Sequence, residues 1–177
     1  MKPYFVKLAL VAGCLGAAVS ASADEKASFV LPSGASVEIV EADFDRSRFE
    51  VTGCDGQSDV CLINGRIPFG VDGSVPGSYV KSIRITHQGQ THELDVSDMY
   101  NAWGGRPLQY DEHTRYFGGT CFDYAPYCQF RGLFSDAAGS FVAEWLVRGD
   151  VSVRTILTNQ VDVVNFISDN IDPPEFE

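Results

Sequence analysis

Four cysteines form two pairs of equal spacing, and they have the widest range of possible chemistry in this chain. Cys54 and Cys61 enclose the polar stretch DGQSDV, and Cys121 and Cys128 enclose FDYAPY. Zinc sites favour two to four residues between the cysteines of a pair, and thiol redox motifs favour two. This spacing therefore favours disulfide bonds over a metal or redox centre, provided that the compartment is oxidising.

The N-terminus predicts that this compartment is the periplasm. Basic residues precede the uncharged run LALVAGCLGAAVSASA, which ends in small residues and is followed by Asp24. This pattern is typical of a secretory signal peptide over residues 1–23, and the apolar run is too short for stable membrane insertion. A second interpretation takes VAGC as a lipoprotein motif that would acylate Cys14.

Removal of the signal peptide leaves one domain, residues 24–177, with 11 basic and 24 acidic residues and a net charge of −13. A chain of this length can bury a sizeable core. The acidic charge argues against nucleic acid as a partner, because phosphates require lysine and arginine. It suits a basic partner, although it would also serve solubility alone.

The four cysteines of this domain can pair in three ways. We expect Cys54–Cys61 and Cys121–Cys128, because short loops close most readily. In the chain-entropy model each such loop stabilises the fold by about 2.5 kcal/mol.

No group of residues in the sequence predicts catalysis. His87 and His92 would face each other across a hairpin whose loop is Gly89-Gln90, but no third metal ligand accompanies them. His113 lies in a polar stretch without a nucleophile, and the sequence lacks the Gly-x-Ser-x-Gly motif of serine hydrolases. We therefore expect neither an enzyme, nor a bound metal, nor a cofactor.

The elements that must position these residues are mostly β-strands. Short alternating apolar runs are separated by turns, with a hairpin at Gln88-Gly89 and further turns at 135–139 and 149–150. One helical pattern follows Thr158-Asn159, which offers an N-cap, and we expect a loose acidic tail from about residue 169. The predicted fold class is all-β, an antiparallel sandwich or curled meander with one short C-terminal helix.

Several loops carry residues suited to binding a protein. Aromatic and arginine side chains on preorganised loops lose little freedom on binding, and small residues at a turn tip fit a narrow cleft. We expect a partner to contact the turn at 135–140, with both disulfide-closed loops beside it. The candidate residues are Ser135, Asp136, Ala138, Gly139, Ser140, Trp103, Arg106 and Tyr124.

Four longer segments are INGRIPFGVDGSVP (63–76), LDVSDMYNAWGGRP (94–107), GLFSDAAGSFVAEWLVRGDVSVRTILT (132–158) and VDVVNF (161–166). Together they resemble a family of small exported bacterial proteins associated with immunity to secreted antibacterial effectors. A looser likeness is to periplasmic lysozyme inhibitors, which insert a serine-glycine loop followed by tyrosine, or a disulfide-closed loop, into the lysozyme cleft. Here the glycine and serine at 139–140 stand in inverted order and the tyrosine is absent.

Both likenesses imply stoichiometric blockade of a wall-degrading enzyme. The sequence therefore predicts a periplasmic binding protein that occludes a toxic cell-wall-degrading effector, acting as an immunity protein. The expected partner is a protein, either a secreted toxin or a peptidoglycan-degrading enzyme. The alternatives are a small hydrolase of the cell envelope and an envelope binding module without inhibitory action.

Overall fold

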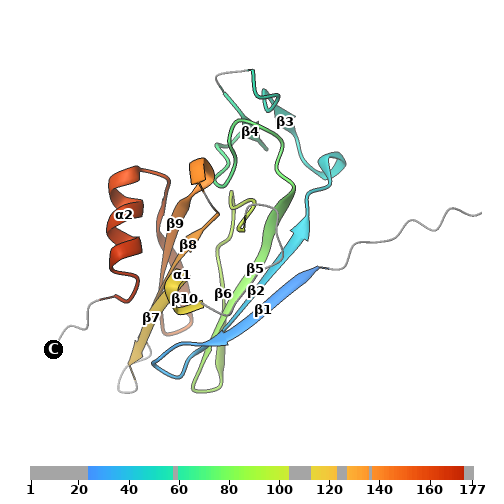
Figure 1. Cartoon of the computed structure of the whole chain (residues 1–177). Coiled ribbons are helices and arrows are strands. Elements are labelled where there is room, and N and C mark those ends of the chain that lie inside the picture. The colour runs from blue at the N-terminus through green and yellow to red at the C-terminus, as the bar shows by residue number, and fades with distance from the viewer. Residues whose placement is uncertain (1–23, 58–59, 104–112, 123–126, 136, 174–177) are drawn as a thin grey trace, which may run out of the picture.

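The computed structural model describes residues 24–57, 60–103, 113–122, 127–135 and 137–173 (Figure 1). The strands are β1 (Glu25–Val30), β2 (Ser36–Asp43), β3 (Val51–Thr52), β4 (Leu62–Ile63), β5 (Ser78–His87), β6 (Gln90–Leu94), β7 (Phe117–Phe122), β8 (Tyr127–Phe134), β9 (Phe141–Arg148) and β10 (Val151–Thr158). The helical elements among these residues are η1 (Arg46–Arg48), α1 (His113–Tyr116), η2 (Ala137–Gly139) and α2 (Val161–Asp169). The predicted signal peptide with Cys14, and the candidate residues Arg106, Tyr124 and Asp136, lie outside the described residues.

Two antiparallel four-stranded sheets make up the body of the molecule. The first has the strand order β1-β2-β5-β6, and the second has the order β10-β9-β8-β7. Residues 25–94 build the first sheet and residues 117–158 build the second. Each sheet therefore comes from one continuous part of the chain.

The core lies between the two sheets, where the side chains on the inner faces of both sheets meet. Its largest fully buried side chains include Val37, Ile39, Ile83 and Ile85 of the first sheet and Phe130, Phe134, Phe141 and Trp145 of the second. The rings of Phe130 and Trp145 stack with centroids 5.6 Å apart. The buried indole N–H donates to the Asp95 carbonyl at 2.8 Å, which satisfies the polar end of the tryptophan.

Residues 44–77 leave the first sheet between β2 and β5 and form a small excursion at one end of the sandwich. Its β3–β4 hairpin is closed by the Cys54–Cys61 disulfide. Phe49 and other apolar side chains pack there around the buried ring of Tyr100. Figure 1 shows this end at the top, beside η2.

Helix α2 covers part of the outer face of the second sheet, beside β8 and β9 (Figure 1). Ile167 is its buried contact, whereas Phe166 is 64% exposed. The N-cap is Gln160, which corrects the predicted Thr158-Asn159 cap. The Thr158 hydroxyl instead accepts a hydrogen bond from the Gln160 N–H at 3.1 Å, so it closes a turn before the helix begins.

The chain after α2 crosses the outer face of the second sheet. Arg131 donates to the Asn170 carbonyl at 3.0 Å, and a methyl group at Gly118 would lie 2.2 Å from the Ile171 carbonyl oxygen. The predicted loose tail is thus packed at residues 170–171, because a position without a side chain lets the two backbones approach closely. Arg131 also forms a buried ion pair with Glu144, with nitrogen and oxygen 2.6 Å apart.

The sequence-based fold class is confirmed in its main features. The fold is mostly antiparallel β with a helix near the C-terminus, and the two disulfides are Cys54–Cys61 and Cys121–Cys128. The short helix α1 was not anticipated. Among the residues that the structure describes, no helix has the length and apolar character needed to cross a membrane.

Candidate functional site

Three segments that are far apart in the sequence meet at the end of the sandwich that carries the excursion. They are residues 63–70, 95–103 and 135–140, and we call the surface that they form the apical surface. The first two segments are joined by main-chain hydrogen bonds, such as that from the Tyr100 N–H to the Phe69 carbonyl at 2.9 Å. Three of the segments quoted for the family resemblance contribute to this surface.

The turn at 135–140 is exposed at its tip and held at its base. Ser135 adopts a left-handed φ of 62°, and its N–H donates to the Ala102 carbonyl at 2.5 Å. Ala138 is exposed, whereas the two residues that follow it are half-buried. The structure therefore brings the described candidates of this turn together on a fixed backbone.

Trp103 also belongs to the apical surface, but its ring packs against the edge of the core. The indole is half-buried, with its centroid 5.5 Å from that of Phe117 and 5.9 Å from that of Phe134. Its role in the structure is packing, and its role as a partner contact stays a prediction.

The two disulfide-closed loops lie at opposite ends of the sandwich. Cys54–Cys61 belongs to the excursion at the apical end. Cys128 stands near the start of β8 and pairs with Cys121 across the β7–β8 ladder, whereas the turn at 135–140 follows the end of β8. A strand rises about 3.3 Å per residue, so roughly 20 Å separate Cys128 from the turn at 135–140. The expectation that both loops flank the turn is wrong for Cys121–Cys128.

A pocket of about 310 Å³ lies between the excursion and the first sheet, and most of its lining residues belong to the segments of the apical surface. Its aromatic wall includes Phe49, Tyr79 and Tyr100, and its polar wall includes Asn64, Arg66 and Asp98. This combination of apolar walls with a few convergent polar groups is typical of binding sites.

Two of the residues that line this pocket form an ion pair. The Arg66 guanidinium lies 2.6 Å from the Asp98 carboxylate, with Arg66 59% exposed and Asp98 12% exposed. Burial raises the pKa of Asp98, and the charges of Arg66 and Arg154 offset only part of that rise. Burial, together with the negative charge of Asp98, also raises the pKa of Tyr100 to about 12. The pocket thus holds a mostly buried carboxylate whose charged form is stabilised by Arg66 and Arg154.

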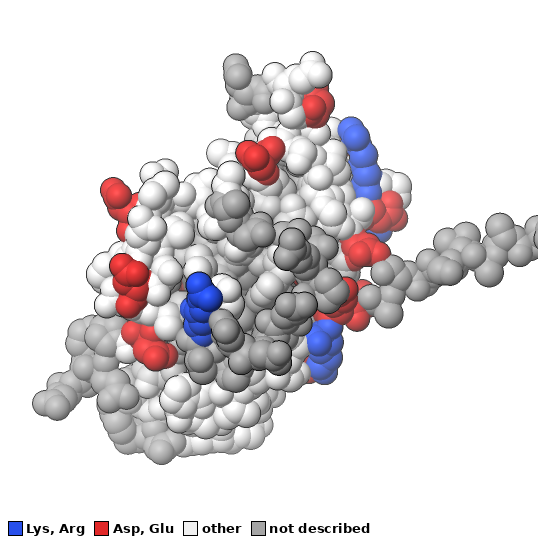
Figure 2. All heavy atoms as spheres, in the orientation of Figure 1, with Lys and Arg blue, Asp and Glu red and all other residues white. Residues whose placement is uncertain are grey.

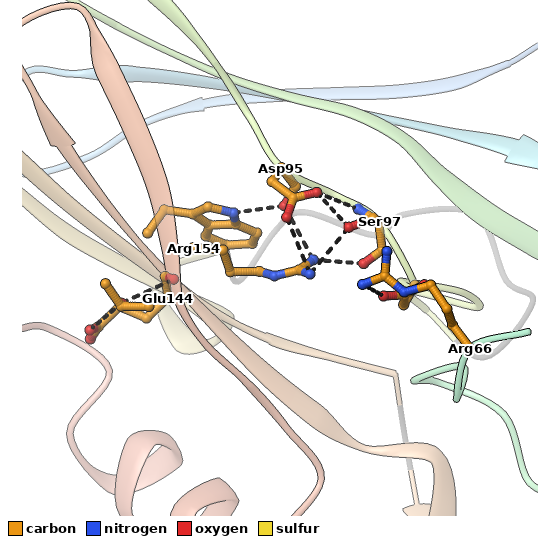
Figure 3. A network of polar contacts seen from close by, with 8 residues as sticks. Arg66, Asp95, Ser97, Glu144 and Arg154 are labelled. Carbon is orange, nitrogen blue, oxygen red and sulfur yellow. Dashed lines mark hydrogen bonds and ion pairs between the residues drawn. The ribbon is translucent and has the colours of Figure 1, made fainter.

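A polar network fixes the segment that carries this carboxylate to the second sheet (Figure 3). Arg154 of β10 donates to the Ser97 carbonyl at 2.6 Å and lies 3.2 Å from the Asp95 carboxylate. Burial pushes the pKa of Asp95 upward, but hydrogen bonds from Ser97 and the charge of Arg154 outweigh it and lower the pKa overall. These contacts join the two sheets beside β6 and hold the polar wall of the pocket in place.

A buried carboxylate supports the apical surface from behind. Glu41 of β2 is 4% exposed, and it accepts hydrogen bonds from the Ala102 N–H at 3.0 Å and from the Ser78 hydroxyl. Because the Ala102 carbonyl in turn accepts from the Ser135 N–H, Glu41 supports the turn through one intermediate residue. Burial raises the pKa of Glu41 in spite of these hydrogen bonds, and neighbouring acidic groups add to the rise.

Replacement of Glu41 by glutamine is expected to stabilise the protein increasingly as the pH rises. A folded-state pKa above the unfolded value means that folding takes up a proton, so wild-type stability falls as the pH rises from about 4.5 through the folded value. Glutamine keeps an oxygen acceptor for the Ala102 N–H and carries no charge to desolvate. Urea unfolding of both proteins across the acidic and neutral range measures the effect. A stability difference that is independent of pH would contradict this account.

The histidines of the β5–β6 hairpin do not face each other. The hairpin turns at Gln88-Gly89, and the register pairs His92 with Ile85 and His87 with Gln90. The condition for facing histidines, a Gly89-Gln90 loop, is therefore not met. Over the described part of the chain, no group of three or more histidine, cysteine, aspartate or glutamate side chains is placed to hold a metal.

The sequence did not predict the pocket or the buried carboxylate of Glu41, which supports the apical surface. Arg66 and Asp98 belong to different loops, and a single sequence does not indicate which charges will pair. The available signals were turn dipeptides such as Asn64-Gly65, which mark a loop without showing what it meets.

No protein-family model, curated protein or solved structure matches this chain.

Proposed function

We propose that this protein is exported to the periplasm by residues 1–23 and there binds and occludes a toxic cell-wall-degrading effector, acting as an immunity protein. Its partner is then a protein, and the apical surface is the surface that binds it. Two disulfides suit an oxidising compartment. The family resemblance supports the same function, since three of its four segments contribute to the apical surface.

The observation that carries this proposal is the braced turn at 135–140. Its base is fixed by the hydrogen bond from Ser135 to Ala102, and its exposed tip carries the small side chain of Ala138. A turn that is ordered before binding loses little conformational entropy on docking. A narrow tip can enter an active-site cleft, where the hydroxyls of Ser135 and Ser140 would bond groups that normally hold substrate.

The charge of the molecule favours a basic partner. The chain carries 24 acidic and 13 basic residues, and Figure 2 shows acidic groups spread over the visible face with few basic groups between them. Complementary charge accelerates association and selects partners.

An Ala138→Trp substitution is expected to abolish protection while leaving the fold intact. An exposed turn tip tolerates a bulky side chain within about 0.5 kcal/mol of stability. A tip that enters a cleft does not, so affinity should fall by about a hundredfold or more. The measurements are thermal melting, calorimetric binding to any secreted effector that is found to be encoded beside this protein's gene, and survival of cells that produce that effector.

Gln90→Trp is the matched control, because Gln90 is exposed at the β5–β6 turn, on the opposite end of the sandwich. That variant should bind and protect like wild type. If Ala138→Trp protects equally well, the turn does not enter the cleft. If wild type protects against no adjacent effector but cleaves cell-wall material, the hydrolase alternative is correct.

A further inference from the structure

The pocket of the apical surface combines a carboxylate with aromatic rings, which is a composition suited to a cation. On the basis of the proposed function, we propose that this pocket receives an arginine or lysine side chain of the partner, and that Arg66 occupies the Asp98 carboxylate in the free protein. On binding, the partner's cation displaces the Arg66 guanidinium into solvent and takes its place on the carboxylate.

The two side chains of the ion pair differ in their exposure to solvent, and this difference makes Arg66 replaceable. Its side chain is 59% exposed, whereas that of Asp98 is 12% exposed. An exposed arginine gains little from one ion pair and loses little when it returns to water. A mostly buried carboxylate without a cation is costly, so Asp98 is the fixed part of the site and requires one cation or another.

The aromatic wall adds a second attraction for the same ligand. The rings of Phe49 and Tyr79 meet edge to face with centroids 5.4 Å apart, and both are half-buried at the pocket. Aromatic faces attract guanidinium and ammonium groups, while their apolar surface packs on the methylene chain. The volume of about 310 Å³ is at the lower end of the range for ligand pockets, which suits a single long side chain.

The polar wall is fixed before any ligand arrives. Asp98 and Asn64 both have left-handed backbones, with φ of 66° and 53°. The Asp98 carbonyl accepts from the Phe69 N–H at 2.8 Å, and the Asn64 side chain accepts from the Glu50 N–H at 2.9 Å. Residues held in this uncommon conformation cluster at binding sites, where the surrounding structure maintains them.

An anion fits this site less well than a cation. A carboxylate or phosphate placed against Arg66 would stand beside Asp98, and the negative charge of the whole chain would repel it. The donors of Arg66 face the carboxylate of its own chain. Both facts favour exchange of one cation for another.

A small probe tests the pocket without the partner. N-acetyl-L-arginine amide, titrated into ¹⁵N-labelled protein, should cause saturable shifts of the amide signals of Phe49, Arg66 and Asp98. Asp98→Asn should weaken binding about tenfold or more, because a charge-assisted hydrogen bond is lost, and asparagine tolerates the left-handed backbone. Arg66→Ala should strengthen binding several-fold, because it removes the internal competitor.

Matched controls come from an exposed ion pair on the first sheet. Arg84 and Glu38 lie 3.4 Å apart there, and Glu38→Gln and Arg84→Ala change the net charge as the two test variants do. Both should leave probe affinity within about twofold of wild type, which separates local contact from the long-range field. N-acetyl-L-norleucine amide, which lacks the charge, should cause no saturable shifts.

Two results with the small probes would overturn the cation pocket. One is the absence of saturable shifts with the arginine probe in both wild type and Arg66→Ala. The other is saturable binding of acetate that disappears in Arg66→Ala, which would make the pocket an anion site. Probe binding by a protein that protects against no effector would refute the proposed function while leaving the cation pocket established. Full protection by Asp98→Asn would show that the pocket does not serve the partner.

Discussion

Replacement of Gly70 by alanine is expected to lower the free energy of unfolding by about 4 kcal/mol, close to the largest effects of single substitutions. Gly70 has a φ of 88°, and an added Cβ would lie 1.8 Å from the Tyr100 carbonyl oxygen. A side chain is strained in that conformation, and here it would also force apart two segments that the Tyr100 N–H joins to Phe69. The urea midpoint with intact disulfides measures the loss.

Gly73→Ala is the matched control for this collision. Gly73 belongs to the same excursion and has a φ of 65°, but an added Cβ there meets nothing within 4 Å. The Gly73→Ala substitution should therefore cost only the strain of the left-handed backbone, about 1–2 kcal/mol of stability. Equal losses in the two variants would show that the close crossing of Gly70 and Tyr100 is not what stabilises the apical surface.

Replacement of Glu144 by alanine is expected to cost about 3–5 kcal/mol, because it leaves a buried guanidinium without its counter-ion. Arg131 and Glu144 stand opposite each other on β8 and β9, and they are 6% and 9% exposed. Arg131 also holds the Asn170 carbonyl at the end of α2. Urea unfolding should show the loss of stability, and hydrogen exchange should show faster opening of α2.

Two further variants distinguish the effect of burial on stability from the effect of charge. Glu38→Ala removes a carboxylate that pairs with Lys26 and Arg84 on the surface of the first sheet, and we expect a loss of at most about 1 kcal/mol. The double variant Arg131→Met with Glu144→Leu removes both buried charges and should lie much closer to wild type than Glu144→Ala does. If Glu144→Ala is no less stable than Glu38→Ala, the buried pair does not anchor this face.

The strands could be predicted because most of them have one buried face, and such strands alternate apolar and polar residues. Strand β10 departs from this pattern. A register irregularity between Arg154 and Ile156 changes which residues face inward, so Val151 and Val153 are exposed while Leu157 packs against the core. A bulge of one residue moves each later side chain of the strand to the opposite face of the sheet. The sequence does not indicate where such a bulge occurs.

The candidate turn could also be predicted, because small and turn-forming residues mark it. The pocket could not. Arg66 and Asp98 meet only because the chain at Phe69 pairs with residues 98–100. That pairing depends on tertiary structure, and no local pattern indicates it. Glu41 was equally hidden, since an acidic residue in a strand normally faces solvent.

The division of the chain into two sheet-forming halves has a consequence for how the protein matures. Each disulfide closes within its own half, between cysteines seven positions apart. If the protein is exported as proposed, its chain leaves the translocation pore N-terminus first, and Cys54 and Cys61 can meet before Cys121 has emerged. Disulfide formation takes seconds to hours, depending on the oxidant, so we expect these local pairs to form in order of appearance where oxidation is faster than the emergence of the later cysteines. The first sheet would expose its apolar face until β8 and β9 emerge, so we expect a chaperone to act mainly during that interval.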